Sequence, residues 1–465
     1  MFIIILYIYF VSFLDKPQTD TPVLSQRALA QRAKWNIPTD KLDEPVSAVY
    51  TDSLRRMGVR IHHQSRWFNG ATCEMSEAIA AQVQALSFVT EVEMTRDYSD
   101  PIYAPKHRIR TSVVNAQTSP LYNWTNEQLD LFNLLPLHAA GYEGQGILMA
   151  ICDGGFNNAD NLASFRQTQE LGHFDFTDDT DDFYGSTGTH GTECLSTITA
   201  IGNGYYGAAT QAEYYLMRAE ENRTESPKEM DNLVAALEKA DSLGVNVFSV
   251  SLGYAMFDND EWTLSKQDLD GQSTRVSRAA TIAARKGMLV CVAAGNEGNH
   301  PWHTISAPAD ADSILTVGAV DTDGVIGDFS SYGPSADGRA KPDVCAVGVQ
   351  ATLMLPDGTI VTGNGTSFAT PLIAGMAASL WSALPDENAM QIRERILRSA
   401  DRYNRPDPTR YGYGIPDAWN AYTNASSVQE SREQMTEQPQ KVIRGDRILI
   451  VRFGHIYNLA GQRVE

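Results

Sequence analysis

Apolar runs alternate with amphipathic stretches over residues 123–423. Runs with almost no polar residue are typical of strands buried on both faces, and their alternation with helix-like stretches is typical of a parallel sheet. The predicted strands are 147–152, 245–250, 288–293 and 314–320. The pattern therefore predicts an α/β fold, a mostly parallel sheet with helices on both faces, in a domain that we place at residues 119–423.

A different pattern precedes this domain and predicts a small α+β unit over residues 21–118. Helix, strand, helix and strand are predicted in that order. They fall at residues 46–58, 59–61, 76–86 and 88–94. A polar, proline-containing stretch over 97–120 joins this unit to the sheet, and such stretches are easily cut by proteases.

The chain begins with an apolar segment. Residues 1–14 are almost all apolar or aromatic, too few to span a bilayer and of the right length for the apolar part of a signal peptide. We therefore assign residues 1–20 as signal-like. A start codon placed too early is the alternative, because a basic start and a clear cleavage site are missing.

The end of the chain is poorer in apolar residues. Residues 424–440 are rich in Ser, Glu and Gln and predict an extended linker. Residues 441–465 predict a short tail with at most a small hairpin, formed by strands at 448–451 and 454–464. No run after the first segment is long and apolar enough to span a membrane.

Composition narrows the choice of partners. The 465 residues are 43% hydrophobic, enough for a large core, and their net charge is −20 at pH 7. A phosphate backbone or an anionic lipid surface would repel such a chain, which excludes nucleic-acid binding. The five cysteines have no paired close spacing, so we expect buried thiols and neither a zinc site nor a disulfide framework.

Two ionisable residues lie where such a fold carries chemistry. Asp153 follows a predicted strand directly and precedes two glycines that permit a tight turn. His190 lies among small residues, in Gly-Thr-His-Gly-Thr, and the pKa range of histidine suits a general base. Taken alone, His190 has an ordinary explanation as a surface or core residue.

Two further residues offer a nucleophile and a hydrogen-bond donor. Ser367 ends the glycine-rich run Gly-Asn-Gly-Thr-Ser before an apolar helix predicted at 372–384, where free backbone amides favour developing negative charge. Asn296, in Ala-Gly-Asn-Glu-Gly, has an amide that can donate to an oxyanion. A helix cap and a turn asparagine are the alternatives for the two.

Together these segments resemble the subtilisin family of serine peptidases in the order Asp, His, Asn, Ser and in their spacing. The resemblance covers residues 122–422 and implies a subtilisin-like fold and a secreted serine endopeptidase. The matching segments are 150–156, 190–192, 249–253, 293–298 and 365–371, with 329–334 and 341–344 similar to linking segments of the family.

The resemblance also implies a role for each residue. Ser367 would be the nucleophile and His190 its base. Asp153 would orient the base, and Asn296 would donate to the oxyanion beside the backbone amide of the serine. A strand edge that pairs with extended substrate would be formed by Ser251, Leu252 and Gly253. The departures from the family pattern are mild: Cys152 replaces a larger aliphatic residue, and two glycines follow the acid.

The N-terminal unit resembles the inhibitory pro-segment of the family, and residues 65–69 resemble a stretch of related bacterial exported peptidases. We therefore expect polypeptide substrates, the pro-segment as the chain's own inhibitor, and bacterial export to the medium or the cell surface. An independent binding module is the alternative for this unit. Residues 456–464 look like the end of a type nine sorting tail but are far shorter than a full sorting domain, which leaves the export route open.

We expect no cofactor. The acid-rich residues 175–182 invite a calcium interpretation but lack a ligand pattern, and a solvated acidic surface is favoured. An esterase would need Gly-x-Ser-x-Gly and the order Ser, acid, His, which the chain lacks. A catalytically silent peptide-binding protein on the same fold is the remaining alternative, and the presence of all four chemical residues argues against it.

Overall fold

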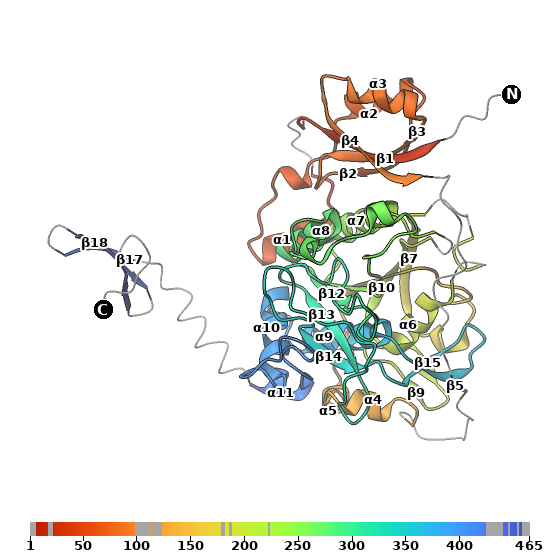
Figure 1. Ribbon diagram of the computed structural model, residues 1–465. Helices are drawn as coiled ribbons and strands as arrows, with labels where there is room; N and C mark the ends of the chain where they lie inside the picture. The colour runs from red at the N-terminus through yellow and green to blue at the C-terminus, as the bar shows by residue number, and fades with distance from the viewer. Residues whose placement is uncertain are drawn as a thin grey trace.

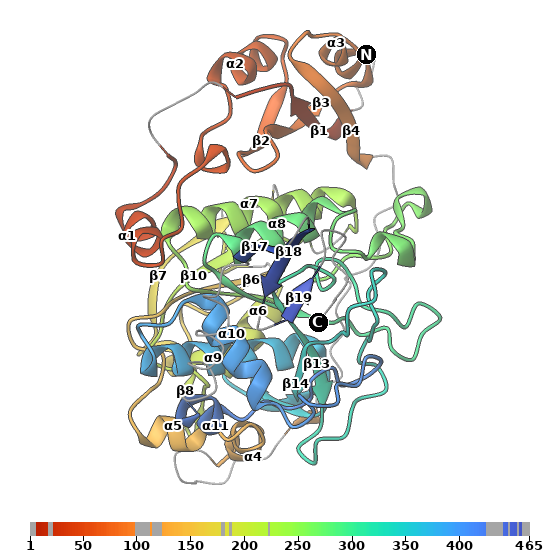
Figure 2. The same ribbon diagram turned by 90° about the vertical axis from the view of Figure 1, so that its left-hand side faces the viewer.

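The computed structural model shows a small N-terminal unit lying against a larger α/β unit, with a small C-terminal sheet apart from both (Figure 1). Figure 2 shows the same arrangement of the two larger units from the side. The residues that the structure describes are 6–16, 22–97, 112–113, 123–177, 182–185, 188–221, 224–424, 440–444, 447–452 and 455–457.

The N-terminal unit is a four-stranded antiparallel sheet, in the order β2-β3-β1-β4, that carries two helices on one face. Side chains such as Leu54, Cys73 and Val83 are fully buried between the sheet and these helices. The elements are β1 (Tyr7–Phe13), α2 (Ala48–Arg56), β2 (Arg60–Ser65), β3 (Gly70–Met75), α3 (Glu77–Gln84) and β4 (Val89–Asp97). The predicted α+β pattern is confirmed, with β1 and β3 in addition.

Strand β1 corrects the interpretation of residues 1–20 as a signal-like segment. It lies between β3 and β4, and its alternate residues face opposite ways. Tyr9 and Val11 pack toward the two helices, whereas Ile8 and Phe10 belong to the other face and are 0% and 3% exposed. A strand buried on both faces has the same continuous apolar pattern as a short leader, so hydrophobicity alone does not separate the two.

A seven-stranded sheet forms the centre of the larger unit, in the order β14-β13-β12-β11-β6-β10-β7, and every neighbouring pair is parallel. The four predicted strands are its central ones, β13, β12, β11 and β6. The strands are β6 (Leu148–Asp153), β7 (Gln169–Asp175), β10 (Glu213–Arg218), β11 (Val247–Val250), β12 (Leu289–Ala293), β13 (Leu315–Val320) and β14 (Val344–Val347).

Helices cover both faces of this sheet, which confirms the predicted fold class (Figure 1). Along β6, Leu148 and Ala150 pack on the side of α7 and α8, whereas Met149 and Ile151 pack on the side of α6 and α9. The helices of this unit are α4 (Asn126–Asp130), α5 (Leu135–Ala139), α6 (His190–Thr199), α7 (Pro227–Leu243), α8 (Arg275–Arg285), α9 (Thr366–Ala383), α10 (Ala389–Ser399) and α11 (Ala418–Thr423).

Short elements complete the chain. They are α1 (Gln26–Lys34), η1 (Lys41–Asp43), β5 (Ser112–Val113), η2 (Ala163–Phe165), β8 (Ile201–Gly202), β9 (Tyr205–Tyr206), η3 (Asp260–Trp262), η4 (Lys266–Asp268), β15 (Ala351–Met354) and β16 (Ile360–Gly363). Strand β5 pairs with β16. Residue 112 therefore already belongs to the larger unit, which moves the boundary ahead of the expected position at 118.

The C-terminal tail forms a three-stranded antiparallel sheet, one strand more than the predicted hairpin. Its strands are β17 (Gln440–Arg444), β18 (Arg447–Arg452) and β19 (His455–Tyr457). Most of the predicted linker, and residues 458–464 of the sorting-like stretch, lie outside the described residues. None of the described helices is long and apolar enough to cross a membrane. All five cysteines are buried, as expected.

Candidate active site

The predicted site residues come together at the carboxyl edge of the large sheet. Asp153 is the last residue of β6, His190 is the first residue of α6, and Ser367 lies in the first turn of α9. Asn296 lies in the loop that follows β12. Ligands of open parallel sheets bind at this edge, beyond the carboxyl ends of the strands. Four segments that are far apart in the sequence meet there.

Asp153 and His190 form a buried pair. Oδ1 of Asp153 lies 2.6 Å from Nδ1 of His190, and the two residues are 0% and 7% exposed. The same oxygen accepts the backbone N–H of Gly154 at 2.7 Å. Gly191 is required for this approach, because a Cβ there would lie 2.4 Å from the backbone oxygen of Gly155. The glycines around the acid and the histidine thus let α6 begin tightly against the end of β6.

The pair has a defined effect on the imidazole. Burial by itself would lower the pKa of His190, because the charged form loses its hydration. The negative charge of Asp153 and its hydrogen bond outweigh burial and raise the pKa of His190 well above its ordinary value. The imidazole of His190 therefore holds a proton more tightly than an exposed histidine does.

Ser367 is held beside this pair. Its Oγ donates to the backbone oxygen of Ser251 at 3.3 Å, and the Oγ of Ser251 donates to the backbone oxygen of Ser367 at 2.9 Å. The thiol of Cys194, on α6, lies 3.3 Å from the same oxygen of Ser367 and 3.8 Å from Nδ1 of His190. One buried thiol thus contacts both the histidine and the serine segment.

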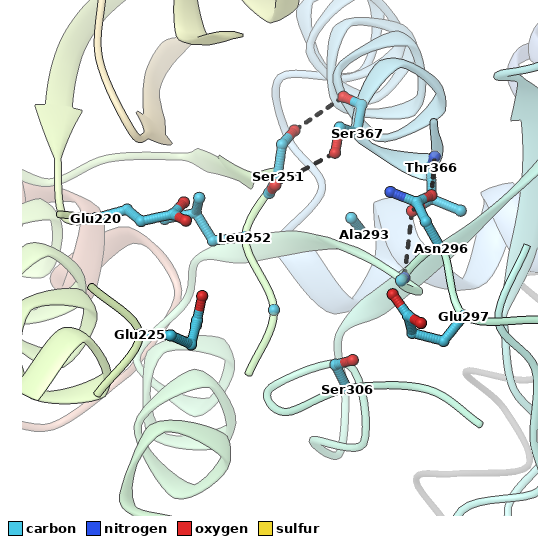
Figure 3. A pocket seen from close by; sticks show the side chains of 12 residues that line it. Glu220, Glu225, Ser251, Leu252, Ala293, Asn296, Glu297, Ser306, Thr366 and Ser367 are labelled. Atoms are coloured by element: carbon cyan, nitrogen blue, oxygen red, sulfur yellow. Dashed lines mark hydrogen bonds between the residues drawn. The ribbon is translucent and has the colours of Figure 1, made fainter. Parts of the chain in front are cut away.

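The direction of the Asn296 side chain is fixed. Its Oδ1 accepts the backbone N–H of Thr366 at 2.9 Å and the hydroxyl of Thr366 at 3.1 Å. The hydroxyl oxygen of Thr366 in turn accepts the backbone N–H of Gly295 at 3.2 Å. With Oδ1 bound in this way, the amide nitrogen is the end of the side chain that points into the neighbouring space (Figure 3).

That space is a cavity of about 130 Å³. The structure brings the predicted strand edge to it, together with Asn296 and Ser367. The lining residues are Glu220, Glu225, Ser251, Leu252, Gly253, Ala293, Gly295, Asn296, Glu297, Ser306, Thr366 and Ser367. Sequence reasoning did not name Thr366, Cys194, Ser306 or the three glutamates. Thr366 and Glu297 are sequence neighbours of named residues, whereas Ser306 and Glu225 are brought in only by the fold.

The acid-rich stretch 175–182 is only partly described, since residues 178–181 lie outside the described part. Asp175 forms an ion pair with Arg218 at 3.1 Å and accepts hydrogen bonds from the backbone and hydroxyl of Thr177. Within the described residues, the ligand-type side chains close enough to share a metal ion are Asp153, His190 and Cys194. They belong to the buried pair described above and to its neighbouring thiol.

The N-terminal unit lies on α7 and α8 with the sheet face that its own helices leave free (Figures 1 and 2). The guanidinium of Arg275, at the start of α8, lies 3.8 Å from the ring centroid of Phe10 in β1. It also forms ion pairs with Asp231 of α7, at 2.9 Å, and with Glu93 of β4. The two units therefore share a layer of apolar and charged contacts.

The turn between β2 and β3 makes a denser polar contact. Glu238 of α7 accepts the backbone N–H groups of Arg66 and Trp67, at 2.9 and 3.2 Å, and the hydroxyl of Ser65 at 2.5 Å. The guanidinium of Arg66 pairs with Asp241 at 2.6 Å. All five residues are buried. This turn, which we call the β2–β3 clamp, is the stretch that resembles other exported peptidases.

A second contact involves the segment between β1 and α2. Arg32 of α1 pairs with Asp241 at 2.6 Å, so this aspartate holds arginines from two parts of the N-terminal unit. Asp43 pairs with Arg32 at 3.2 Å and with Lys286, just after α8, at 2.9 Å. The N-terminal unit is thus tied to the ends of both helices by buried ion pairs.

Comparisons with known proteins agree with this division. Residues 144–414 match the family model of the Subtilase family, and residues 8–111 match that of the Peptidase S8 propeptide domain of Bacteroidota. The second match includes all of β1 except Tyr7 and ends just before β5. It therefore supports both structural corrections, the assignment of the first strand and the earlier domain boundary.

Similar proteins cover most of the larger unit. Subtilisin DY of Bacillus licheniformis is 30% identical over 283 residues, which are 60% of this chain and 92% of the relative. Subtilisin E of Bacillus subtilis strain 168 is 26% identical over 360 residues, 76% of this chain and 81% of the relative. The crystal structure of MycP1 from Mycobacterium smegmatis shares the fold with a TM-score of 0.53 and 21% identity, covering 69% of this chain and 91% of that chain. The chain therefore belongs to the subtilase family and is a subtilisin-like serine endopeptidase with an N-terminal propeptide domain.

Proposed function

We propose that this endopeptidase cuts peptide bonds through Ser367, His190 and Asp153. The observation that supports the proposal most strongly is the buried 2.6 Å hydrogen bond between Asp153 and His190, at the sheet edge where Ser367 lies in the first turn of α9. His190 takes the proton of the serine hydroxyl as that oxygen attacks the carbonyl, and then gives it to the leaving amine. Asp153 keeps a proton on Nδ1, which leaves Nε2 to act as the base.

The negative oxygen of the tetrahedral intermediate needs donors that are in place before charge develops. We assign this role to the amide nitrogen of Asn296 and the backbone N–H of Ser367. The first is supported by the hydrogen bonds of Thr366, which hold the opposite atom of the amide. The second is supported by the position of the serine at a helix N-terminus, where backbone N–H groups lack helical partners.

Ser251, Leu252 and Gly253 follow β11 along the cavity. We assign them as the strand edge that pairs with substrate backbone. Pairing of this kind requires a chain that can extend, so unfolded or flexible polypeptides are the proposed substrates. No cofactor enters this mechanism.

The propeptide domain acts as the chain's own inhibitor in this proposal. The β2–β3 clamp and the ion pairs on α7 and α8 hold the propeptide domain against the larger unit. Its last strand, β4, ends near the cavity, because Arg96 pairs with Glu221, the sequence neighbour of the lining residue Glu220. The residues expected to enter the cleft, 98–111, lie outside the described part of the chain. An enzyme blocked until it is processed suits export from the cell, which we keep as part of the proposal.

Labelling with an organofluorophosphonate, which reacts with activated serines, tests the catalytic assignment. We expect the label on Ser367 of the processed protein, located by peptide mapping, and none in a His190→Ala variant whose circular dichroism is unchanged. A catalytically silent peptide-binding protein would take up no label in either form. Label on a different serine would also overturn the assignment.

A further inference from the structure

We propose that the cavity beside Ser367 selects a cationic side chain, Lys or Arg, at the substrate residue whose carbonyl is attacked. This inference rests on the proposed function and adds a substrate class to it. It concerns the cavity lined by the strand edge, Asn296 and three glutamates (Figure 3).

Position decides which substrate residue fills the cavity. Ser367, Thr366 and Asn296 all line it and lie next to one another (Figure 3). A carbonyl group placed between the nucleophile and the oxyanion donor therefore holds its own side chain over this cavity. The side chains of more distant substrate residues lie farther along the strand edge.

Two glycines keep the cavity open. A Cβ at Gly253 would lie 3.1 Å from the Cβ of Ser306, and a Cβ at Gly295 would lie 3.2 Å from the Oγ of Ser306. Ser306 is 6% exposed, lines the cavity and lies close to both glycines, so it adds a buried hydroxyl to the lining. A slot of this shape accepts a long, unbranched side chain with a polar end better than a branched or aromatic one.

The charged side chains described around the cavity are negative. Glu220, Glu225 and Glu297 line the cavity, and among the residues that the structure describes no Lys, Arg or His lines it. Figure 3 shows Glu225 and Glu297 on opposite sides of the space above Ser306, with Glu220 beside Leu252. A cationic side chain would gain attraction from these carboxylates. An apolar side chain would remove water from them without compensation, and an acidic one would be repelled.

The two glutamates that face each other are fixed at their backbones. The N–H of Glu297 donates to the Oγ of Ser331 at 2.9 Å, and the N–H of Glu225 donates to a carboxylate oxygen of Asp258 at 2.8 Å. The carboxylate of Glu297 is 2.5 Å from Nδ1 of His300, a residue whose side chain is 60% exposed. The negative groups are therefore part of the built cavity.

The sequence between the two units carries the complementary charge. Residues 98–111 include Lys106, Arg108 and Arg110, although the whole chain has a net charge of −20. In the proposed function, this connecting segment is the first polypeptide that the enzyme cuts. Its basic composition agrees with a cavity that selects cations.

The test uses the full chain after it has processed itself and peptides that differ only at the residue before the cut bond. We expect kcat/KM to be at least about 10-fold higher for Lys than for norleucine, its uncharged analogue of similar length, and lowest for Glu. This comparison needs no variant. High salt should reduce the ratio of Lys to norleucine, because screening weakens attraction at a partly exposed site.

Variants assign the effect to the glutamates. Glu225→Gln and Glu297→Gln should each lower the ratio by about threefold or more. The matched control is Glu394→Gln, because Glu394 lies on α10, pairs with Arg398 and does not line the cavity. It should leave the ratio unchanged.

The outcomes separate the two proposals. A ratio near one, or a preference for norleucine or phenylalanine with peptidase activity intact, overturns the cationic preference and leaves the proposed function standing. A preference for Lys that both glutamine variants and high salt leave unchanged overturns the role of the carboxylates. No cleavage of any peptide or of a denatured protein overturns the proposed function itself.

Discussion

The side-chain oxygen of Asn296 accepts the backbone N–H of Thr366 at 2.9 Å. A backbone N–H can only donate, so the atom that it contacts is the carbonyl oxygen of the amide and not the nitrogen. The residue before the proposed nucleophile therefore sets the direction in which Asn296 donates. This link joins the proposed oxyanion donor to the serine segment.

Replacement of Asn296 should affect the transition state more than the bound substrate. Its amide meets a full negative charge only when the oxyanion forms, so Asn296→Ala should lower kcat by about 10²–10³ with little change in KM. Steady-state kinetics on one peptide measures both constants. Thr366→Val keeps the backbone hydrogen bond to Asn296 and loses the hydroxyl, which donates to Asn296 and accepts the N–H of Gly295, so its loss of kcat should be smaller than that of Asn296→Ala. A rise in KM alone would contradict the assignment.

The pH dependence follows from the pKa of His190. Only the neutral imidazole can take the serine proton, and Asp153 raises the pKa of His190 above its ordinary value of 6.5. As the pH falls through this raised pKa, the imidazole becomes protonated and kcat/KM should fall. Removal of the charge in Asp153→Asn should move this loss to lower pH and lower kcat by about 10⁴. A wild-type profile that stays flat down to pH 5 would argue against this base.

The β2–β3 clamp should control how long the processed propeptide domain stays bound. Arg66→Ala leaves the carboxylates of Glu238 and Asp241 buried with one cation fewer, which costs about 3–5 kcal/mol when a buried pair is broken. The activity of the full chain should therefore appear sooner after processing. The control is Arg56→Ala, because Arg56 lies on α2 and its guanidinium bonds Asp52 and Ser53 of the same helix. Equal lag times for the two variants would show that the clamp does not hold the inhibitor.

The central strands of the fold could be predicted because burial on both faces leaves a continuous apolar run, as in β6. Strand β7 escaped prediction since its exposed and part-buried residues give no such run. The same pattern led to a wrong prediction at the start of the chain, because β1 is apolar on both faces. Its helix-facing residues are buried within the N-terminal unit, and Phe10 is buried on the side of the larger unit. Tertiary structure decides what covers each face of a strand, and local hydrophobicity does not predict it.

Asp153, His190, Asn296 and Ser367 could be named because each lies in a short glycine-rich motif next to a strand or helix end. Their supporting residues could not all be named in that way. Thr366 acts through its two hydrogen bonds to Asn296, and Ser306 reaches the cavity only because its loop folds back close to Gly253 and Gly295. A lone serine in a loop carries no signal of such a position.

The central claim is that Ser367 performs the cleavage that first separates the two units. Its direct test is the intact mass and N-terminal sequence of the purified full chain, wild type beside Ser367→Ala. We expect the wild type to be cut after β4 and before β5, and the variant to stay whole, with the same circular dichroism, until wild-type enzyme is added. A variant that processes itself like the wild type, or that cleaves other polypeptides at a similar rate, would contradict the account.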